Sequence, residues 1–230
     1  MFQAEDILYE DNHLIVVNKH PGDLVQPDPS GSSALENEIK AFIKARDSKP
    51  GEVFLGVIHR LDRPVSGAVA FAKTSKALVR MNEMLKQREL HKTYWAVTER
   101  CPAPEAGELR HFIARDPRTN KSYASARPSP TAKEARLSYR TLGGSTNYFL
   151  VEIELHTGRH HQIRCQLSGI GCPIRGDLKY GAARSLKGGG ISLHARKLEF
   201  VHPVRKEPLT ITAPVPAGDS LWAFFETEYR

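Results

Sequence analysis

Alternation of apolar and polar positions marks several strands along the chain. The clearest example is 148–155, where apolar side chains alternate with Glu152 and Glu154. A half-buried β-strand has this period of two. Further strands are predicted at 7–9, 14–18, 53–58, 67–72, 92–98, 191–194, 197–201 and 208–213, with hairpin strands within 109–140.

Apolar residues spaced three and four positions apart predict helices between these strands. The first covers about 33–46, where Ser33 and Glu36 have the spacing of a capping box. A second runs from Thr74 or Ser75 to about residue 89, with a hydroxyl as its N-cap. Two more are predicted at about 161–168 and after Asp219.

The order of these elements indicates the fold class. The strands do not alternate regularly with helices, which disfavours a doubly wound parallel sheet. We expect an α+β fold with a mixed, largely antiparallel sheet and flanking helices. No composition shift marks a linker in the 230 residues, so a single domain over 1–230 is expected, with no S4-like module before the first strand.

Composition excludes several classes of protein. No run of 18 apolar residues is present, which argues against a membrane span, and the N-terminus lacks the pattern of a secretory signal. The three cysteines, Cys101, Cys165 and Cys172, form no C-x-x-C pair. This pattern is typical of a reducing cytoplasm and disfavours a structural zinc site.

The positive charge is concentrated in two segments. The formal net charge is +7, yet residues 109–140 hold 8 Lys/Arg against 2 Asp/Glu, and residues 158–206 hold 10 against 2. The rest of the chain is mildly acidic. If both segments face one side, they form a surface suited to the phosphates of a nucleic acid. A solvated basic face is the simpler alternative.

Most candidate motifs for metals and phosphates have simpler explanations. His156, His160 and His161 cluster in sequence, but the Thr157-Gly158 break separates them and their spacing is not that of a metal site. Gly188–Gly190 lacks the context of a phosphate-binding loop. We therefore expect no metal and no cofactor.

Asp62 is the unusual acidic residue. It lies between Arg60 and Arg63, directly before Pro64 and a buried strand, so the backbone turns tightly there. Neighbouring positive charges favour the ionised carboxylate, which could act as a nucleophile or a base. A structural role in neutralising arginines or capping the turn is equally consistent with the local sequence.

Two other groups of side chains could bind a substrate. Lys92 and Tyr94 place a cation and an aromatic ring on one predicted strand, and strand alternation allows only one of Tyr94 and Trp95 to line a site. Five potential hydrogen-bond donors to phosphate or carboxylate follow within 157–164: Arg159, His160, His161, Gln162 and Arg164.

These motifs together resemble the RluA family of RNA pseudouridine synthases. The matching stretches are H-R-L-D-R-P-V-S-G at 59–67, K-T-Y-W-A-V at 92–97, T-G-R-H-H-Q-I-R at 157–164 and G-I-G-C-P-I-R-G-D-L-K-Y-G at 169–181. Weaker matches are V-V-N-K-H-P-G at 16–22, L-H-A at 193–195 and H-P at 202–203. Two positions differ from the family pattern. The family usually has Thr at the position of Val65, and Ser or Thr is common at the position of His160.

The resemblance implies a fold and a reaction. The fold has a central cleft floored by the catalytic aspartate, and the reaction rejoins a uracil base to its ribose through carbon 5, without a cofactor or a metal. Matched by position, Asp62 is the essential carboxylate, Tyr94 stacks on the target base, Arg164 pairs with the aspartate and Arg60 enters the RNA stack. The remaining residues expected to contact RNA are Arg63, Lys92, Arg159, His160, His161 and Gln162.

Two alternatives belong to other classes. A non-catalytic RNA-binding protein could keep this fold, although the intact set of Asp62, Tyr94 and Arg164 disfavours it. A glycoside hydrolase would need a second carboxylate motif, and none pairs with Asp62. The sequence leaves open whether the RNA is tRNA or rRNA, and a monomer is expected.

Overall fold

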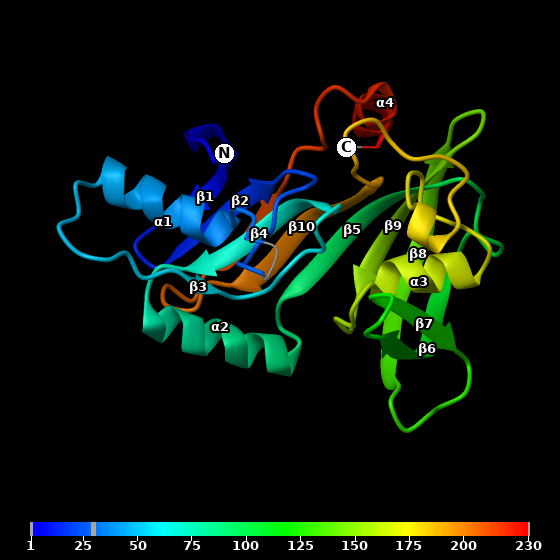
Figure 1. Cartoon of the computed structure of the whole chain (residues 1–230), viewed down its shortest axis with the longest axis horizontal. Helices are drawn as coiled ribbons and strands as arrows, with labels where there is room; N and C mark the ends of the chain where they lie inside the picture. The colour runs from blue at the N-terminus through cyan, green and yellow to red at the C-terminus, as the bar shows by residue number, and fades with distance from the viewer. Residues whose placement is uncertain (1, 29–30, 230) are drawn as a thin grey trace. The chain divides into compact units, whose positions relative to one another are not determined.

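The computed structural model describes residues 2–28 and 31–229 and divides into two compact units (Figure 1). The first unit comprises 1–91 and 195–216, and the second comprises 92–194 and 217–230. Each unit is described by itself. The expectation of a single catalytic domain stays a prediction.

The first unit contains a sheet in the order β1-β2-β4-β10, with β3 paired to β4 and β11 paired to β10. Helices α1 and α2 belong to this unit, and α2 packs against β3 and β4 (Figure 1). The elements are η1 (Ala4–Asp6), β1 (Ile7–Glu10), β2 (Leu14–Lys19), α1 (Leu35–Arg46), β3 (Gly56–Val57), β4 (Ser66–Ala72), α2 (Ser75–Gln87), β10 (Leu193–Val201) and β11 (Pro208–Thr212).

Strand β4 forms the centre of the first unit's core. Each of its seven residues is buried, as expected for a strand covered on both faces. Its antiparallel register with β2 runs from Leu14↔Ala72 to Lys19↔Gly67. The last residue of β2, Lys19, therefore lies opposite Gly67, the second residue of the strand that follows the Asp62 loop.

Gly67 permits a close approach between two strands. Its φ is +115°, and a Cβ built there would lie 2.4 Å from the carbonyl oxygen of Ala195 on β10. Only glycine tolerates both this dihedral and this contact. Every residue type other than glycine is therefore disfavoured at position 67, just after the turn that follows Asp62.

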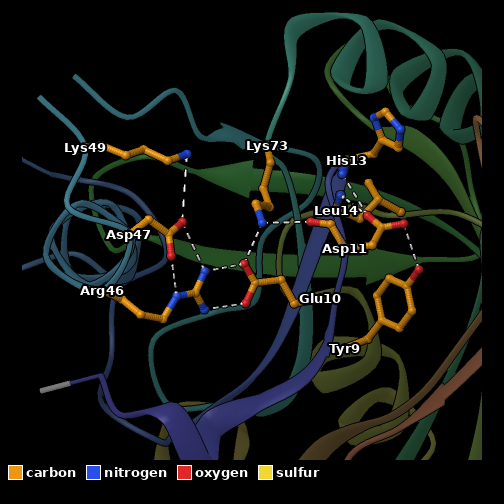
Figure 2. Close-up of polar contacts among 9 residues, drawn as sticks. All are labelled: Tyr9, Glu10, Asp11, His13, Leu14, Arg46, Asp47, Lys49 and Lys73. Atoms are coloured by element: carbon orange, nitrogen blue, oxygen red, sulfur yellow. Dashed lines mark hydrogen bonds and ion pairs between the residues drawn. The ribbon is translucent and has the colours of Figure 1, made fainter. Parts of the chain in front are cut away.

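A polar network joins β1, α1 and the end of β4 (Figure 2). The Glu10 carboxylate accepts hydrogen bonds from Arg46 Nη1 at 2.7 Å and from Lys73 Nζ at 2.5 Å. The bond from Arg46 lowers the pKa of the Glu10 carboxyl. Next to it, Asp11 Oδ1 accepts from the backbone N–H groups of His13 and Leu14, which closes the β1–β2 turn. These bonds fix the start of the β2 strand.

The second unit contains a sheet in the order β5-β9-β8-β6-β7, and every one of these pairs is antiparallel. Helix α3 packs against β6 and β7 (Figure 1). The elements are β5 (His91–Thr98), β6 (Ala106–Asp116), β7 (Lys121–Ser125), β8 (Lys133–Gly144), β9 (Phe149–Leu155), α3 (Gln162–Gly169), η2 (Leu178–Tyr180) and α4 (Ser220–Glu228).

The predicted fold class is confirmed: the structure is α+β, with a mixed, mostly antiparallel sheet. The strand at 148–155 is present, with Val151 and Ile153 buried and Glu154 exposed. Thr74 caps α2 through the N–H of Ala77, and Asp219 caps α4 through the N–H of Leu221. None of the helices in the described part of the chain is long and apolar enough to cross a bilayer.

Three local predictions are wrong. The strand expected at 53–58 is only two residues long, and the strands expected at 191–194 and 197–201 are one strand, β10. The capping box at Ser33 is also absent. The first N–H groups of α1 donate instead to the carbonyls of Leu24 and Val25, so the backbone replaces the side-chain cap.

Candidate active site

Asp62 lies in the loop between β3 and β4 of the first unit. Its side chain is partly exposed, its backbone carbonyl accepts from the N–H of Val65 at 3.0 Å, and Arg60 and Arg63 beside it are exposed. A backbone hydrogen bond therefore closes this turn. The carboxylate of Asp62 is partly accessible to solvent, and the guanidinium groups of Arg60 and Arg63 are accessible.

The side chain of Lys19 is hydrogen-bonded to the backbone of this loop. Its side chain is 1% exposed, and its Nζ donates to the carbonyl oxygens of His20 at 2.9 Å, Arg63 at 3.1 Å and Val65 at 2.6 Å. Three acceptors match the three N–H bonds of an ammonium group. Burial lowers the pKa of Lys19 to about 8, opposed by the negative charges of Asp23 and Asp62.

Gly22 and Arg63 add a second connection between the same two segments. The N–H of Gly22 donates to the Arg63 carbonyl at 2.8 Å, and Arg63 Nε donates to the Gly22 carbonyl at 3.0 Å. The K-H-P-G segment thus binds the backbone on the C-terminal side of Asp62 at several points. Sequence analysis selected Arg63 as an RNA contact and missed Lys19, whose only signal was its place in the weaker V-V-N-K-H-P-G match.

His59 shows how the other side of the loop is held. Its side chain is buried, and its Nε2 accepts from the backbone N–H of Ala70 at 3.2 Å. An accepting Nε2 carries no proton, so this histidine is in the neutral Nδ1–H form. The loop is therefore tied to β4 at His59 as well as to β2 at Lys19.

Tyr94 and Lys92 lie on β5 in the second unit. Tyr94 is 6% exposed and Trp95 is 4% exposed, so the two rings on opposite sides of the strand are both buried. Trp95 Nε1 donates to Glu152 at 3.4 Å. Lys92 is half-buried, and burial lowers its pKa.

The loop before α3 carries the predicted cluster of donors. Gln162 is buried, and its amide is used within the unit: Oε1 accepts from Thr157 Oγ1 at 2.8 Å and from the N–H of Arg159 at 3.0 Å, while Nε2 donates to the Arg136 carbonyl at 3.1 Å. Arg159 is exposed and donates from Nε to the Glu134 carbonyl. Gln162 therefore shapes the loop that presents Arg159.

The two histidines of this loop stack on each other. The ring centroids of His160 and His161 are 3.7 Å apart, and His160 Nδ1 is 2.8 Å from Ser122 Oγ. His161 has a left-handed φ of 52° and is buried. Burial, with the positive charge of Arg164, lowers the pKa of His161 to about 2. A neutral histidine is thus fixed beside Arg164.

Arg164 is buried in α3 and forms an ion pair that sequence analysis did not indicate. Its Nε donates to Asp177 Oδ2 at 2.6 Å, and its Nη2 donates to Asp177 Oδ1 at 2.8 Å. These two parallel bonds hold one edge of the guanidinium. The proposed pairing of Arg164 with Asp62 stays a prediction, as does the central cleft.

No metal site emerges from these residues. Among the side chains of residues 2–28 and 31–229, no three His, Cys, Asp or Glu groups are arranged to hold an ion. His156, one of the three clustered histidines, places its Nε2 2.7 Å from Ser138 Oγ.

Comparisons with known proteins identify the class to which this fold and these motifs belong. The family described as RNA pseudouridylate synthase matches residues 13–169. Ribosomal large subunit pseudouridine synthase D of Xylella fastidiosa is 35% identical over 98% of this chain and 73% of its own length. The uncharacterized RNA pseudouridine synthase YhcT of Bacillus subtilis is 34% identical over 92% of this chain and 69% of its length.

A solved structure agrees with the sequence comparisons. Human RNA pseudouridylate synthase domain containing 4 is 28% identical, with a TM-score of 0.77, and the match covers 93% of this chain and 89% of that one. The chain therefore belongs to the RNA pseudouridylate synthase family, whose members isomerise uridine to pseudouridine in RNA.

Proposed function

We propose that this protein converts a specific uridine of a tRNA or rRNA into pseudouridine, with Asp62 as the essential carboxylate. The observation that supports this most directly is the Asp62 loop. Its backbone is bound by the buried Lys19 and by Gly22, while the Asp62 side chain stays partly exposed. A preorganised reactive group on a fixed loop is what catalysis at a sugar–base bond requires.

The reaction exchanges one bond to the ribose for another. The bond between N1 and the anomeric carbon breaks, the base turns, and a bond forms from carbon 5 to the anomeric carbon. The hydrogen on carbon 5 leaves as a proton and N1 gains one, so the mass of the nucleotide is unchanged. Asp62 either attacks the ribose or the base, or assists an elimination at the ribose.

The other roles follow from the matched motifs. In this proposal Tyr94 stacks on the target base, Arg164 supplies the counter-charge of Asp62, and Arg60 occupies the space that the target nucleotide leaves in the RNA. Extruding a nucleotide costs a few kcal/mol. A planar guanidinium can stack in the vacated position and offset part of this cost. Arg63, Lys92, Arg159 and the His160–Gln162 segment contribute to RNA binding.

The experiment measures turnover of RNA made with tritium at carbon 5 of uridine, together with carbodiimide labelling of pseudouridine. Wild-type protein should release tritium, and Asp62→Asn should remain folded, bind the RNA and release none. Asp23→Asn is the matched control, because Asp23 is also an aspartate whose charge acts on Lys19. Tritium release by Asp62→Asn near the wild-type rate would refute the role of Asp62.

The RNA substrate is identified by comparing pseudouridine maps from cells with and without the gene. Large-subunit rRNA is the first place to look, since the Xylella fastidiosa relative is named for that substrate. Unchanged maps together with intact RNA binding would favour the alternative, a non-catalytic RNA-binding protein. The predicted cytoplasmic location and monomeric state are tested by cell fractionation and light scattering.

A further inference from the structure

Arg164 makes two contacts with one short segment of the chain, the G-D-L-K-Y-G stretch at 176–181. The first contact is the two-point bond to Asp177, in which the side chains of Arg164 and Asp177 are 6% and 1% exposed. A bidentate pair fixes the plane of the guanidinium as well as its position. Because Nε and Nη2 face Asp177, the direction of the remaining Nη1 edge is set by this bond.

Tyr180 forms the second contact. The Cζ atom of Arg164 lies 4.9 Å from the centroid of the Tyr180 ring, and Tyr180 is 4% exposed. A cation over a buried aromatic ring is attracted by the negative face of the ring. Asp177 thus holds the edge of the guanidinium while Tyr180 contacts its carbon centre.

The hydroxyl of Tyr180 fixes the ring itself. It accepts from the backbone N–H of Ser122 at 2.8 Å and lies 2.8 Å from His161 Nδ1. Since this hydroxyl already accepts from Ser122, its own proton can be donated to His161 Nδ1. Nδ1 is then unprotonated, and the neutral His161 carries its proton on Nε2. The low pKa of His161 agrees with this form.

We propose that Asp177 and Tyr180 are positioning residues for the reaction, which fix the guanidinium of Arg164 so that its Nη1 edge acts on the substrate site. This inference rests on the proposed function, in which Arg164 is the counter-charge of the catalytic carboxylate. In this proposal, Asp177 and Tyr180 of the G-D-L-K-Y-G motif affect the reaction through Arg164, which lies thirteen positions before Asp177.

The test compares three variants by kcat, KM for RNA and the pH–rate profile. Asp177→Asn removes the charge and the bidentate bond, and Tyr180→Leu removes the ring. Both should lower kcat by about 10²-fold, since small misplacements of a catalytic group have effects of this size. KM should change less than about threefold, because both residues are buried and in this proposal act on the position of Arg164 rather than on RNA binding. The acidic limb of the pH–rate profile should move to higher pH, since the catalytic carboxylate loses a correctly placed cation.

Tyr180→Phe separates the ring from its hydroxyl. It keeps the contact with Arg164 and removes the bonds to Ser122 and His161, so its kcat should recover most of what Tyr180→Leu loses. The matched structural control is Asp219→Asn, which breaks the more exposed Arg175–Asp219 pair of 2.6 Å in the same unit. That variant should lose thermal stability without a change in kcat or in the pH profile.

The outcomes distinguish the two proposals. If the wild-type protein releases no tritium from any RNA, the proposed function fails. If the wild type is active and both Asp177→Asn and Tyr180→Leu behave like Asp219→Asn, the positioning role is refuted while the proposed function stands. Should Asp177→Asn fail to fold, the ordering of Tyr180→Leu and Tyr180→Phe decides the question by itself.

Discussion

Lys19 and Val65 are joined by a hydrogen bond of 2.6 Å from a buried ammonium group to a backbone carbonyl three residues after Asp62. The same Nζ binds two further carbonyls, one of them that of Arg63. The side chain at the end of β2 therefore binds the loop that carries the candidate catalytic residue at two of its carbonyls.

Lys19→Met should destabilise the protein strongly. The Val65 carbonyl loses its donor, while the carbonyls of Arg63 and His20 still accept from the N–H groups of Gly22 and Asp23. A buried unsatisfied group costs about 1–3 kcal/mol, so we expect the free energy of unfolding to fall by about this amount. Denaturant unfolding measures this. The control is Lys40→Met, which removes an i,i+4 pair with Glu36 on α1 and should cost no more than about 0.5 kcal/mol. Equal effects of the two substitutions would contradict the loop-holding role.

Gly67→Ala should be poorly tolerated. A Cβ at this position meets the backbone of Ala195 and requires an L-residue at φ +115°. Strain and overpacking together predict a loss of more than about 3 kcal/mol in thermal or chemical unfolding. Gly51→Ala, where a Cβ has nothing within 4 Å, should change stability by less than about 0.5 kcal/mol. A Gly67→Ala protein as stable as Gly51→Ala would show that β4 and β10 can separate.

The low pKa of His161 predicts how the free energy of unfolding depends on pH. Its pKa is about 2 in the folded protein and about 6.5 in an unfolded chain, so the unfolded state alone binds this proton between those values. Stability is therefore lost as pH falls below about 6.5, by up to about 2 kcal/mol at pH 5 from this group.

His161→Asn tests this dependence, since asparagine tolerates the left-handed φ of 52° at this position. The free energy of unfolding of the variant should fall less steeply between pH 7 and pH 5 than that of the wild type. Parallel curves for the two proteins would mean that the pKa of His161 is the same in the folded and unfolded states.

RNA binding should depend on salt through particular arginines. Several basic residues are already paired with carboxylates, such as Arg110 with Glu134 at 2.8 Å. Arg118 and Arg127 are exposed and form no ion pair within the described ranges. Replacing both with Gln should reduce the slope of log affinity against log salt by about 0.7–0.9 for each phosphate that is no longer bound. Arg110→Gln should leave the slope unchanged, and the reverse pattern would reject this surface as a binding site for phosphates.

The sequence predicts elements where local patterns dominate. The alternation in β9, the N-caps Thr74 and Asp219 and the buried β4 depend on side chains within a few residues of one another. The capping box at Ser33 fails because carbonyls about ten residues upstream supply the acceptors, and no local pattern indicates such a contact. The predicted strand at 53–58 is too long for a similar reason. Apolar composition alone does not show where strand pairing stops, and β3 has only two residues.

In the candidate site too, local motifs could be predicted from the sequence and contacts between distant residues could not. Asp62, Tyr94 and Arg164 can be selected from motifs, but the partners that hold them are distant in sequence. Lys19 is 46 residues from Val65, and a lysine that ends a strand is usually exposed. Asp177 lies in a matched motif, yet its pairing with Arg164 depends on how α3 and η2 pack.

The complete burial of β4 has a consequence for motion near Asp62. The loop enters a strand that has no solvent-facing residue and is paired on both sides, so we expect the backbone amides of this strand to be among the slowest in the first unit to exchange with deuterium. The end of the loop at Ser66, which is itself buried, should share this slow exchange. If Asp62 acts as proposed, the RNA adapts its conformation to this fixed strand, and most of the conformational cost of reaching the reactive geometry falls on the RNA.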